Sequence, residues 1–312
     1  MRINSLILLS ILSIFVNLSN VNAEIIGKDD FGKAIVLDKL PKRIVVTSAT
    51  VIPIIFEMGA GDKIVGVPEK IDSSYTWICE KYPQLLDKPR VGNFSNPSIE
   101  KIVSLSPDLV ICYDSLETPG KYTQGFKKWG IPYASFGSVR DMSHGIEQIK
   151  RLGVLLGKKK EAERLTKRIQ AEISKLAEPV MPLSYKPLVY VWWGSGNLTY
   201  GKPTIVNELI DMAGGINLAG DINRQCPEIS SEYVISKNPD VIIITCWKEE
   251  DKKTRIDAIK EKPCFNQVKA VKNNRVYVID GNSVHSIVRF PEALRNLIKF
   301  IHPEMDIKGA NQ

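Results

Sequence analysis

The chain has 312 residues, of which 44% are hydrophobic and 25% are charged, and these proportions are ordinary for a globular protein. The formal net charge of +7 comes from 42 basic and 35 acidic residues, and the lysines are scattered along the sequence. Such a modest excess does not indicate a nucleic-acid-binding protein, whereas it is compatible with an exported protein that binds an anionic ligand. At this length we expect two lobes rather than a single core.

The first 23 residues are typical of a secretory signal peptide. Arg2 supplies a positive charge, an apolar run over residues 7–16 follows, and small residues end at Ala23, where a signal peptidase would cut. The run is shorter than the about 20 apolar residues of a transmembrane helix. We therefore expect cleavage before Glu24 and a mature chain outside the cytoplasmic membrane, with a retained anchor as the alternative. No cysteine lies near this position, which argues against a lipid-anchored lipoprotein.

Residues 24–140 alternate between expected strands and helices. Strands are expected over residues 33–40, 43–48, 62–67, 108–113 and 131–136, with helices over residues 51–58, 97–106 and 122–129. This alternation predicts a mostly parallel sheet that is covered by helices.

The segment over residues 141–178 has a different pattern. Apolar residues recur at helical spacing, charged residues are dense, and no proline interrupts the segment before Pro179. We expect one long helix, which Gly153 or Gly157 could relax locally. This helix is predicted to connect the lobe over residues 24–140 to a second lobe over residues 179–312.

The second half repeats the order of elements of the first. A motif that reads SIEKIVSLSPDLVIC from Ser98 is echoed from Ser231 as SEYVISKNPDVIIITC. The spacing of 132 positions between Glu100 and Glu232 also separates Pro107 from Pro239. Each copy predicts a short helix, a Pro-Asp turn and a buried strand, so the two lobes are expected to be related by an internal repeat.

These segments together resemble the substrate-binding proteins of ABC importers for iron-siderophores, haem and vitamin B12. The resemblance lies in VIPIIFEMGAGDKIVGV, PRVGNFSNPSIEKIVSLSPDLVICY, LGVLLGKKKEAERL, IVNELIDMAGGINLAGD and VHSIVRFPEALRNLIKFIHPE, whose order and spacing cover nearly all of residues 24–305. It implies the helical-backbone, class III architecture: two Rossmann-like β/α lobes joined by a single long helix, with the ligand in the cleft between them. It also implies limited hinge motion.

In the same family, one glutamate on each lobe docks onto arginines of the membrane permease. The resemblance places these residues at Glu100 and Glu232. Both are expected in the first turn of a helix, where the helix dipole favours a negative charge. Helix capping is therefore the simpler alternative, although the two roles are compatible.

Ligand-binding residues are expected in loops that follow strands and face the opposite lobe. The candidates are Thr47, Ser48, Asn93, Phe94, Tyr113, Trp192, Trp193, Trp247, His285 and Arg289. Tyr75 and Trp77 lie in a loop that could reach the mouth of the cleft. Aromatic residues after three different strands suggest a flat or bulky organic ligand.

Two of these candidates carry specific chemistry. Arg289 is the expected cation for an anionic ligand, with an ordinary salt bridge as the alternative. His285 could coordinate a metal through its imidazole, although a lone histidine in a loop is more often structural. Only three histidines occur and they are dispersed, so a site for bare zinc or manganese is not expected.

The five cysteines form no Cys-x-x-Cys pair, so neither a zinc ribbon nor a redox motif is expected. Cys112 and Cys246 end apolar segments and are expected in the core. The sequence does not specify the pairing of any disulfide.

We therefore expect an exported protein that binds an Fe(III)-siderophore or related chelate and has no intrinsic cofactor. It would deliver the chelate, as a monomer, to an ABC permease and its cytoplasmic ATPase. A cobalamin, haem or nickel-chelate carrier is the alternative within this class, and a receptor that presents ligand to a signalling partner is another. An enzyme is not expected, because no GxGxxG, P-loop, GxSxG or paired Cys/His motif occurs.

Overall fold

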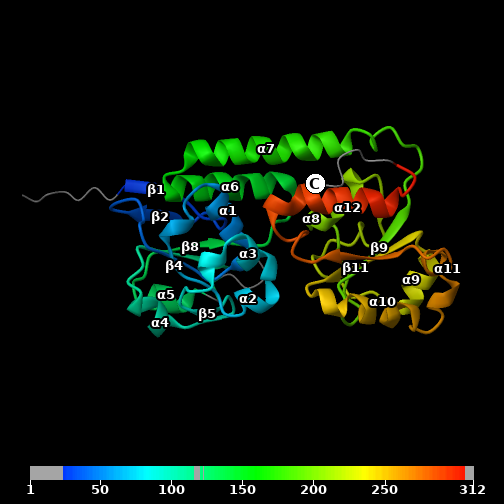
Figure 1. The fold of residues 1–312 in the computed structure, drawn as a ribbon, viewed down its shortest axis with the longest axis horizontal. Helices are drawn as coiled ribbons and strands as arrows, with labels where there is room; N and C mark the ends of the chain where they lie inside the picture. The colour runs from blue at the N-terminus through cyan, green and yellow to red at the C-terminus, as the bar shows by residue number, and fades with distance from the viewer. Residues whose placement is uncertain (1–23, 116–119, 122, 306–312) are drawn as a thin grey trace, which may run out of the picture.

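The computed structural model describes residues 24–115, 120–121 and 123–305, so the expected signal segment over residues 1–23 lies outside the described part of the chain. Two α/β lobes stand side by side, and the helix α7 (Lys159–Ala177) lies across both of them (Figure 1). Each lobe is built on a four-stranded parallel sheet. Among the described residues, no helix is long and apolar enough to cross a lipid bilayer.

The sheet of the first lobe has the strand order β4-β3-β7-β8. Its strands are β3 (Ile44–Val46), β4 (Ile64–Gly66), β7 (Leu109–Tyr113) and β8 (Tyr133–Phe136). The helices of this lobe are α1 (Ile52–Glu57), α2 (Ile71–Ser74), α3 (Thr76–Lys81), α4 (Ile99–Ser104) and α5 (Gln124–Lys128). The inner strands β3 and β7 are apolar and almost wholly buried, as expected for parallel strands with both faces covered.

Two short antiparallel hairpins lie outside this sheet. One pairs β1 (Glu24–Lys28) with β2 (Ala34–Leu37), and the other pairs β5 (Gly92–Asn93) with β6 (Asn96–Pro97). The strand expected over residues 33–40 therefore belongs to a hairpin and not to the parallel sheet.

The sheet of the second lobe has the order β10-β9-β11-β12. Its strands are β9 (Leu188–Trp192), β10 (Ile216–Asn217), β11 (Val241–Cys246) and β12 (Val276–Asp280). Its helices are α8 (Ile205–Met212), α9 (Ser231–Lys237), α10 (Lys252–Lys260), α11 (Lys269–Lys272) and α12 (Phe290–Ile301).

The two sheets have the same topology. In each lobe the first strand along the chain pairs with the second on one side and with the third on the other, and the fourth strand follows the third. The repeated motif occupies the same place in both lobes, because α4 precedes β7 and α9 precedes β11. In sheets of this kind, ligands bind where the strand order reverses, at the carboxyl ends of the strands. The topology therefore points to the ends of β3 and β7 in one lobe and of β9 and β11 in the other.

The connecting segment consists of two helices and not of the single helix expected over residues 141–178. The first, α6 (Met142–Leu156), ends at Gly157, which adopts the left-handed conformation (φ 70°) that closes many helices. The chain then turns back into α7, which packs against α6. A Cβ at Gly153 would stand 2.5 Å from the Cβ of Ala162, so this glycine permits the close approach of the two helices. Of these two helices, α7 is the one that lies across both lobes (Figure 1).

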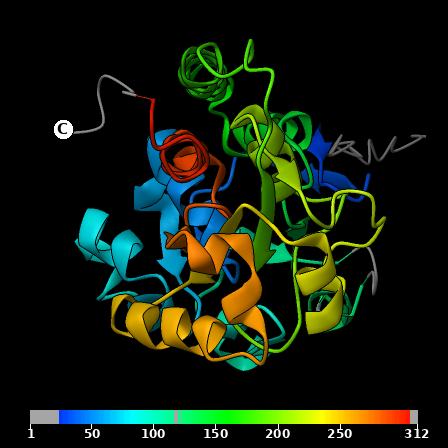
Figure 2. The ribbon, with the colours of Figure 1, turned by 90° about the vertical axis from the view of Figure 1, so that its right-hand side faces the viewer.

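One continuous apolar core joins the lobes. It includes Ile111 of β7, Ile149 of α6, Leu165 of α7, Val191 of β9 and Leu294 of α12, which are all nearly inaccessible to solvent. End-on, α7 and α12 lie above the sheets (Figure 2). Because α7 packs against α6 and α12, movement of one lobe relative to the other requires sliding within a packed core, which limits its extent.

Candidate functional site

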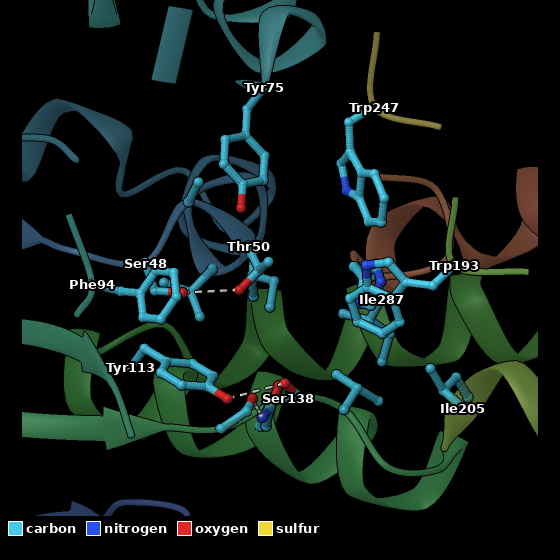
Figure 3. A pocket seen from close by; sticks show the side chains of 17 residues that line it. Ser48, Thr50, Tyr75, Phe94, Tyr113, Ser138, Trp193, Ile205, Trp247 and Ile287 are labelled. Atoms are coloured by element: carbon cyan, nitrogen blue, oxygen red, sulfur yellow. Dashed lines mark hydrogen bonds between the residues drawn. The ribbon is translucent and has the colours of Figure 1, made fainter. Parts of the chain in front are cut away.

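A cavity of about 330 Å³ lies between the two lobes and is called the cleft below. Its walls come from the ends of β3, β7 and β8 in the first lobe and of β9 and β11 in the second, with α6 beneath (Figure 3). The main side chains that line it are Ser48, Thr50, Tyr75, Phe94, Tyr113, Ser138, Gln148, Trp193, Ile205, Trp247, His285 and Ile287. The cleft therefore occupies the position that the sheet topology indicates.

Aromatic and hydroxyl side chains form the wall of the first lobe. Phe94, from the turn of the β5–β6 hairpin, packs edge-on against Tyr113, with ring centroids 5.0 Å apart. The Tyr113 hydroxyl lies 3.5 Å from that of Ser138, and the hydroxyls of Ser48 and Thr50 are 3.0 Å apart. This wall offers aromatic faces and groups that both donate and accept hydrogen bonds.

A cluster of stacked rings forms the wall of the second lobe. Trp193, which follows β9, stacks on Tyr200 with centroids 4.8 Å apart and lies 5.8 Å from Trp247, which follows β11. The His285 ring stacks on Trp247 at 6.1 Å. A Cβ at Gly281 would stand 2.5 Å from the Trp247 ring, so the absence of a side chain there lets the indole lie against the backbone. The backbone at Gly281 thus packs against the ring cluster.

A chain of polar contacts lies behind this cluster. The Thr245 hydroxyl donates to the carbonyl of Trp192, and the Tyr200 hydroxyl lies 3.5 Å from Thr245 Oγ1 and 3.2 Å from His285 Nε2. The His285 ring is thus linked through Tyr200 and Thr245 to the backbone of β9.

Burial keeps this imidazole neutral. Loss of hydration disfavours the imidazolium and lowers the pKa of His285 to about 4, and the nearby Asp280 carboxylate offsets this only in part. At neutral pH His285 thus contributes a ring face and a lone pair rather than a positive charge.

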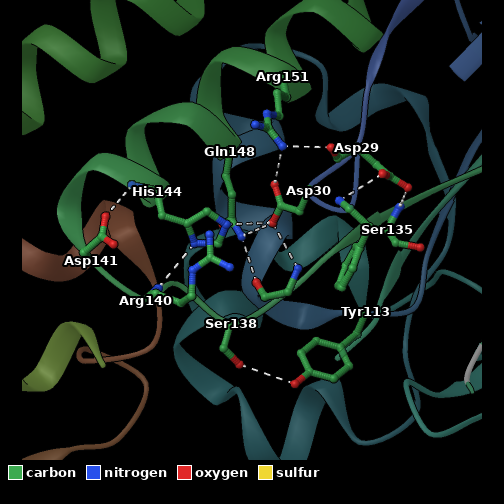
Figure 4. A network of polar contacts seen from close by, with 12 residues as sticks. Asp29, Asp30, Tyr113, Ser135, Ser138, Arg140, Asp141, His144, Gln148 and Arg151 are labelled. Carbon is green, nitrogen blue, oxygen red and sulfur yellow. Dashed lines mark hydrogen bonds and ion pairs between the residues drawn. The ribbon is translucent and has the colours of Figure 1, made fainter. Parts of the chain in front are cut away.

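A buried polar network fixes the first lobe to α6 beside the cleft (Figure 4). Asp30 Oδ2 accepts hydrogen bonds from Gln148 Nε2 at 2.6 Å and from the Gly137 N–H at 3.1 Å, and His144 Nε2 lies 3.3 Å away. Arg151 pairs with Asp30 Oδ1 at 3.5 Å. The Gln148 amide, which lines the cleft, is thereby held in one orientation.

Six of the ten expected ligand-binding residues line the cleft, and four lie elsewhere. The six are Ser48, Phe94, Tyr113, Trp193, Trp247 and His285. Thr47 is buried behind the first wall, and Asn93 Oδ1 accepts from the Ser95 and Asn96 N–H groups in the hairpin turn. Trp192 is buried in a separate apolar cluster on the other face of β9, where its indole N–H donates to the Gly196 carbonyl. Consecutive strand residues point to opposite faces, so Trp192 and Trp193 could not both line the cleft.

Arg289 is held by two carboxylates outside the cleft lining. Its Nη1 lies 2.5 Å from Asp280 Oδ2, and its Nε and Nη2 lie 2.8 Å and 2.6 Å from the two oxygens of Glu292. The guanidinium also lies 4.7 Å from the Trp77 ring centroid. The structure favours the salt-bridge alternative for this residue.

Several residues that line the cleft were not predicted from the sequence. Ser138 follows β8, so the rule that selected Tyr113 and Trp247 would also have found it. Thr50, Ile205 and Ile287 lie in or at the start of short helices, where no local pattern marks them. Tyr75, which was expected only to reach the mouth, points its hydroxyl into the cleft (Figure 3).

The two glutamates of the repeated motif have exposed side chains. Glu100 lies in the first turn of α4 and Glu232 in the first turn of α9. Neither forms an ion pair with another described residue. In α9 the capping hydrogen bond comes from Ser230, whose hydroxyl accepts from the Tyr233 N–H. Hydrogen bonds from its own N–H and from Ser230 lower the pKa of Glu232, so it is ionised at neutral pH.

Residues 44–282 match the family model described as periplasmic binding protein. The chain belongs to this family. It is 25% identical over 282 residues to an ABC transporter substrate-binding lipoprotein of Bacillus subtilis, an alignment that covers 88% of this chain and 85% of the relative. A cobalamin-binding protein of Halobacterium salinarum is 28% identical over 220 residues, which are 69% of this chain and 57% of that protein.

Solved structures agree with this assignment. An ABC transporter substrate-binding protein of Listeria monocytogenes superposes with a TM-score of 0.72 at 25% identity, over 85% of this chain and 100% of that one. This periplasmic binding protein is therefore a substrate-binding component of an ABC transporter and not an enzyme. No group of three or more His, Cys, Asp or Glu residues that could hold a metal ion occurs among its described residues.

Proposed function

We propose that this periplasmic binding protein captures an iron-siderophore or a related metal chelate outside the cytoplasmic membrane and delivers it to the permease of an ABC importer. The observation that carries the proposal is that aromatic side chains of both lobes face one cleft. Tyr75, Phe94 and Tyr113 lie on one side, and Trp193 and Trp247 lie on the other. Rings on opposite walls suit a flat or bulky organic ligand that binds between the lobes.

We assign ligand contact to the six expected residues that line the cleft and to Thr50, Tyr75 and Ser138. The remaining four expected residues act indirectly in this proposal. Thr47 and Trp192 pack behind the walls, Asn93 shapes the turn that carries Phe94, and Arg289 braces the segment that follows His285. The unprotonated ring nitrogen of the neutral His285 accepts a hydrogen bond from the ligand or coordinates an open site on its metal.

Delivery requires a second surface, and we assign it to Glu100 and Glu232. Both are exposed and have no ionic partner among the described residues, which leaves them available to cationic residues of a permease. Ser230 provides the N-cap of α9, and the additional hydrogen bond from the Glu232 N–H to its own carboxylate is compatible with docking. The permease would act with a cytoplasmic ATPase, and the binding protein itself would be a monomer.

A cobalamin, haem or nickel-chelate carrier is the second candidate. The relative that is described as cobalamin-binding supports it, and the aromatic walls suit a macrocycle as well as a siderophore.

Native mass spectrometry combined with metal analysis of the purified protein tests the proposal. We expect a bound organic molecule with a stoichiometric metal, and the identity of both separates the candidates. A protein that retains no chelate, and that acquires none from iron-siderophores, haem, cobalamins or nickel chelates, would contradict the proposal.

A further inference from the structure

The lining of the cleft carries no charged side chain. None of the 17 residues that line it is an aspartate, glutamate, lysine or arginine. Its polar side-chain groups are hydroxyls, the indole N–H groups of Trp193 and Trp247, the His285 imidazole and the Gln148 amide. The N–H groups of that amide already donate to Asp30 and to the Gly137 carbonyl. His285 is neutral, and its Nε2 contacts the Tyr200 hydroxyl. No full positive charge therefore faces the ligand.

The charged groups nearest to the cleft are paired or mixed in sign. The Arg289 guanidinium is neutralised by Asp280 and Glu292. A small hollow that adjoins the cleft at Tyr113 and Ser138 contains two acidic and two basic residues, namely Asp30, Asp114, Arg140 and His144. Arg151 pairs with Asp30 from α6. None of these groups places an unpaired cation in the lining of the cleft.

The aromatic walls also favour some ligand charges over others. The π-face of each ring carries partial negative charge, so an anion against these faces is repelled, whereas a cation or an apolar surface is favoured. An anionic ligand would also lose hydration in the cleft without gaining an ionic partner. An uncharged ligand surface does not incur this cost of lost hydration.

We infer that the cleft selects a chelate that carries no net negative charge, such as a neutral or cationic ferric hydroxamate or a corrinoid, and discriminates against anionic catecholates and carboxylates. This inference rests on the proposed function and narrows it. It also reverses the expectation, based on Arg289, of an anionic ligand.

The test compares ferric chelates that share a metal and differ in charge. Affinities of the mature protein are measured by calorimetry for a neutral ferric trihydroxamate, a monocationic ferric trihydroxamate and a trianionic ferric triscatecholate, with cyanocobalamin and haemin as neutral and carboxylate-bearing macrocycles. We expect the tightest uncharged or cationic probe to bind at least about 100-fold more tightly than the triscatecholate. Cyanocobalamin should likewise bind more tightly than haemin.

A variant that adds charge to the cleft tests the cause. Thr50→Lys places a cation on the first wall, and Thr50→Met is the control with a side chain of similar length and no charge. The lysine variant should gain at least about tenfold in affinity for the triscatecholate relative to the methionine variant. Equal affinities in the two variants would show that charge does not govern selection.

The outcomes separate this inference from the function on which it rests. Triscatecholate or haemin affinity equal to or above that of the uncharged probes would overturn the inference and leave the role as a chelate carrier intact. If none of these probes binds, and a nickel chelate does not bind either, the proposed function itself fails.

Discussion

Gly145 of α6 lies directly against Ile287 of the second lobe. A Cβ at position 145 would stand 2.4 Å from Ile287 Cδ1 and 3.1 Å from Val139 Cγ1. Since Ile287 and Val139 both line the cleft, the absence of a side chain at position 145 lets the connecting helix approach the floor of the cleft. The packing that joins the lobes and the shape of the ligand site therefore depend on the same contact.

A double-mutant cycle tests this contact. Gly145→Ala should force Ile287 to shift, at a cost of about 1–3 kcal/mol that outweighs the gain of up to about 1 kcal/mol in helix propensity. Ile287→Val removes Cδ1, so the double variant should be at least about 0.5 kcal/mol more stable than the sum of the single changes. Urea denaturation measures all four proteins. Gly145→Ala combined with the distant Ile259→Val is the control and should be additive, and additivity at both pairs would refute the contact.

His285 makes stability depend on pH in a defined window. Its pKa is about 4 in the folded chain and returns to its usual 6.5 on unfolding. Between these values the unfolded chain binds more protons than the folded chain, so the free energy of unfolding falls as the pH falls from 6.5 to 4, by up to about 3 kcal/mol. Denaturation curves at intervals between pH 7.5 and 4 should show this loss in the natural protein. The His285→Gln variant should lose less stability over this pH range than the natural protein. Identical pH profiles for the two proteins would contradict the lowered pKa of His285.

Arg289 is expected to act through stability rather than through ligand charge. Arg289→Gln breaks the pairs with Asp280 and Glu292 and should lower the free energy of unfolding by about 2 kcal/mol. Affinity for a neutral chelate should remain within about threefold. Arg295→Gln in α12, the helix that Arg289 precedes as N-cap, is the matched control, because Arg295 has no ion pair among the described residues. A large loss of affinity without a loss of stability would instead indicate that Arg289 contacts the ligand.

The docking role that we propose for the two glutamates can be tested by comparing uptake with ligand binding. Glu100→Ala and Glu232→Ala together should abolish chelate uptake in cells, because both lobes would lose their contacts to the permease. Ligand affinity should be unchanged, since both residues are exposed and absent from the cleft lining. Glu250→Ala, at another acidic position of the second lobe, serves as the control. Normal uptake by the double variant would rule out docking through these residues.

The regular features of the fold were predictable, and the exceptions have local causes. The repeated motif led to two β/α lobes because buried parallel strands are apolar throughout, as in β7 and β11. The helical period of residues 141–178 is the same in one helix as in two, so only the left-handed conformation of Gly157 reveals the turn. That conformation and the close packing at Gly153 depend on contacts that no short sequence window contains.

The same limit applies to the cleft. Residues that follow strands were found from the sequence, because the ends of parallel strands meet at one edge of a sheet. Thr50, Ile205 and Ile287 were not, because they lie in or at the start of short helices, where no local pattern marks a lining residue. The ion-pair partners of Arg289 were also not predicted, although Glu292 lies only three positions away in the sequence.

The central claim is that the cleft between the lobes captures a metal chelate, and fluorescence titration tests it most directly. Trp193 and Trp247 both line the cleft, so a ferric chelate or corrinoid that binds there should quench tryptophan emission saturably with one-to-one stoichiometry. Trp193→Phe/Trp247→Phe should lose most of this quenching, whereas Trp129→Phe, an exposed position outside the cleft, should retain it. Absence of saturable quenching by every chelate and corrinoid, or full quenching in the double variant, would contradict the account.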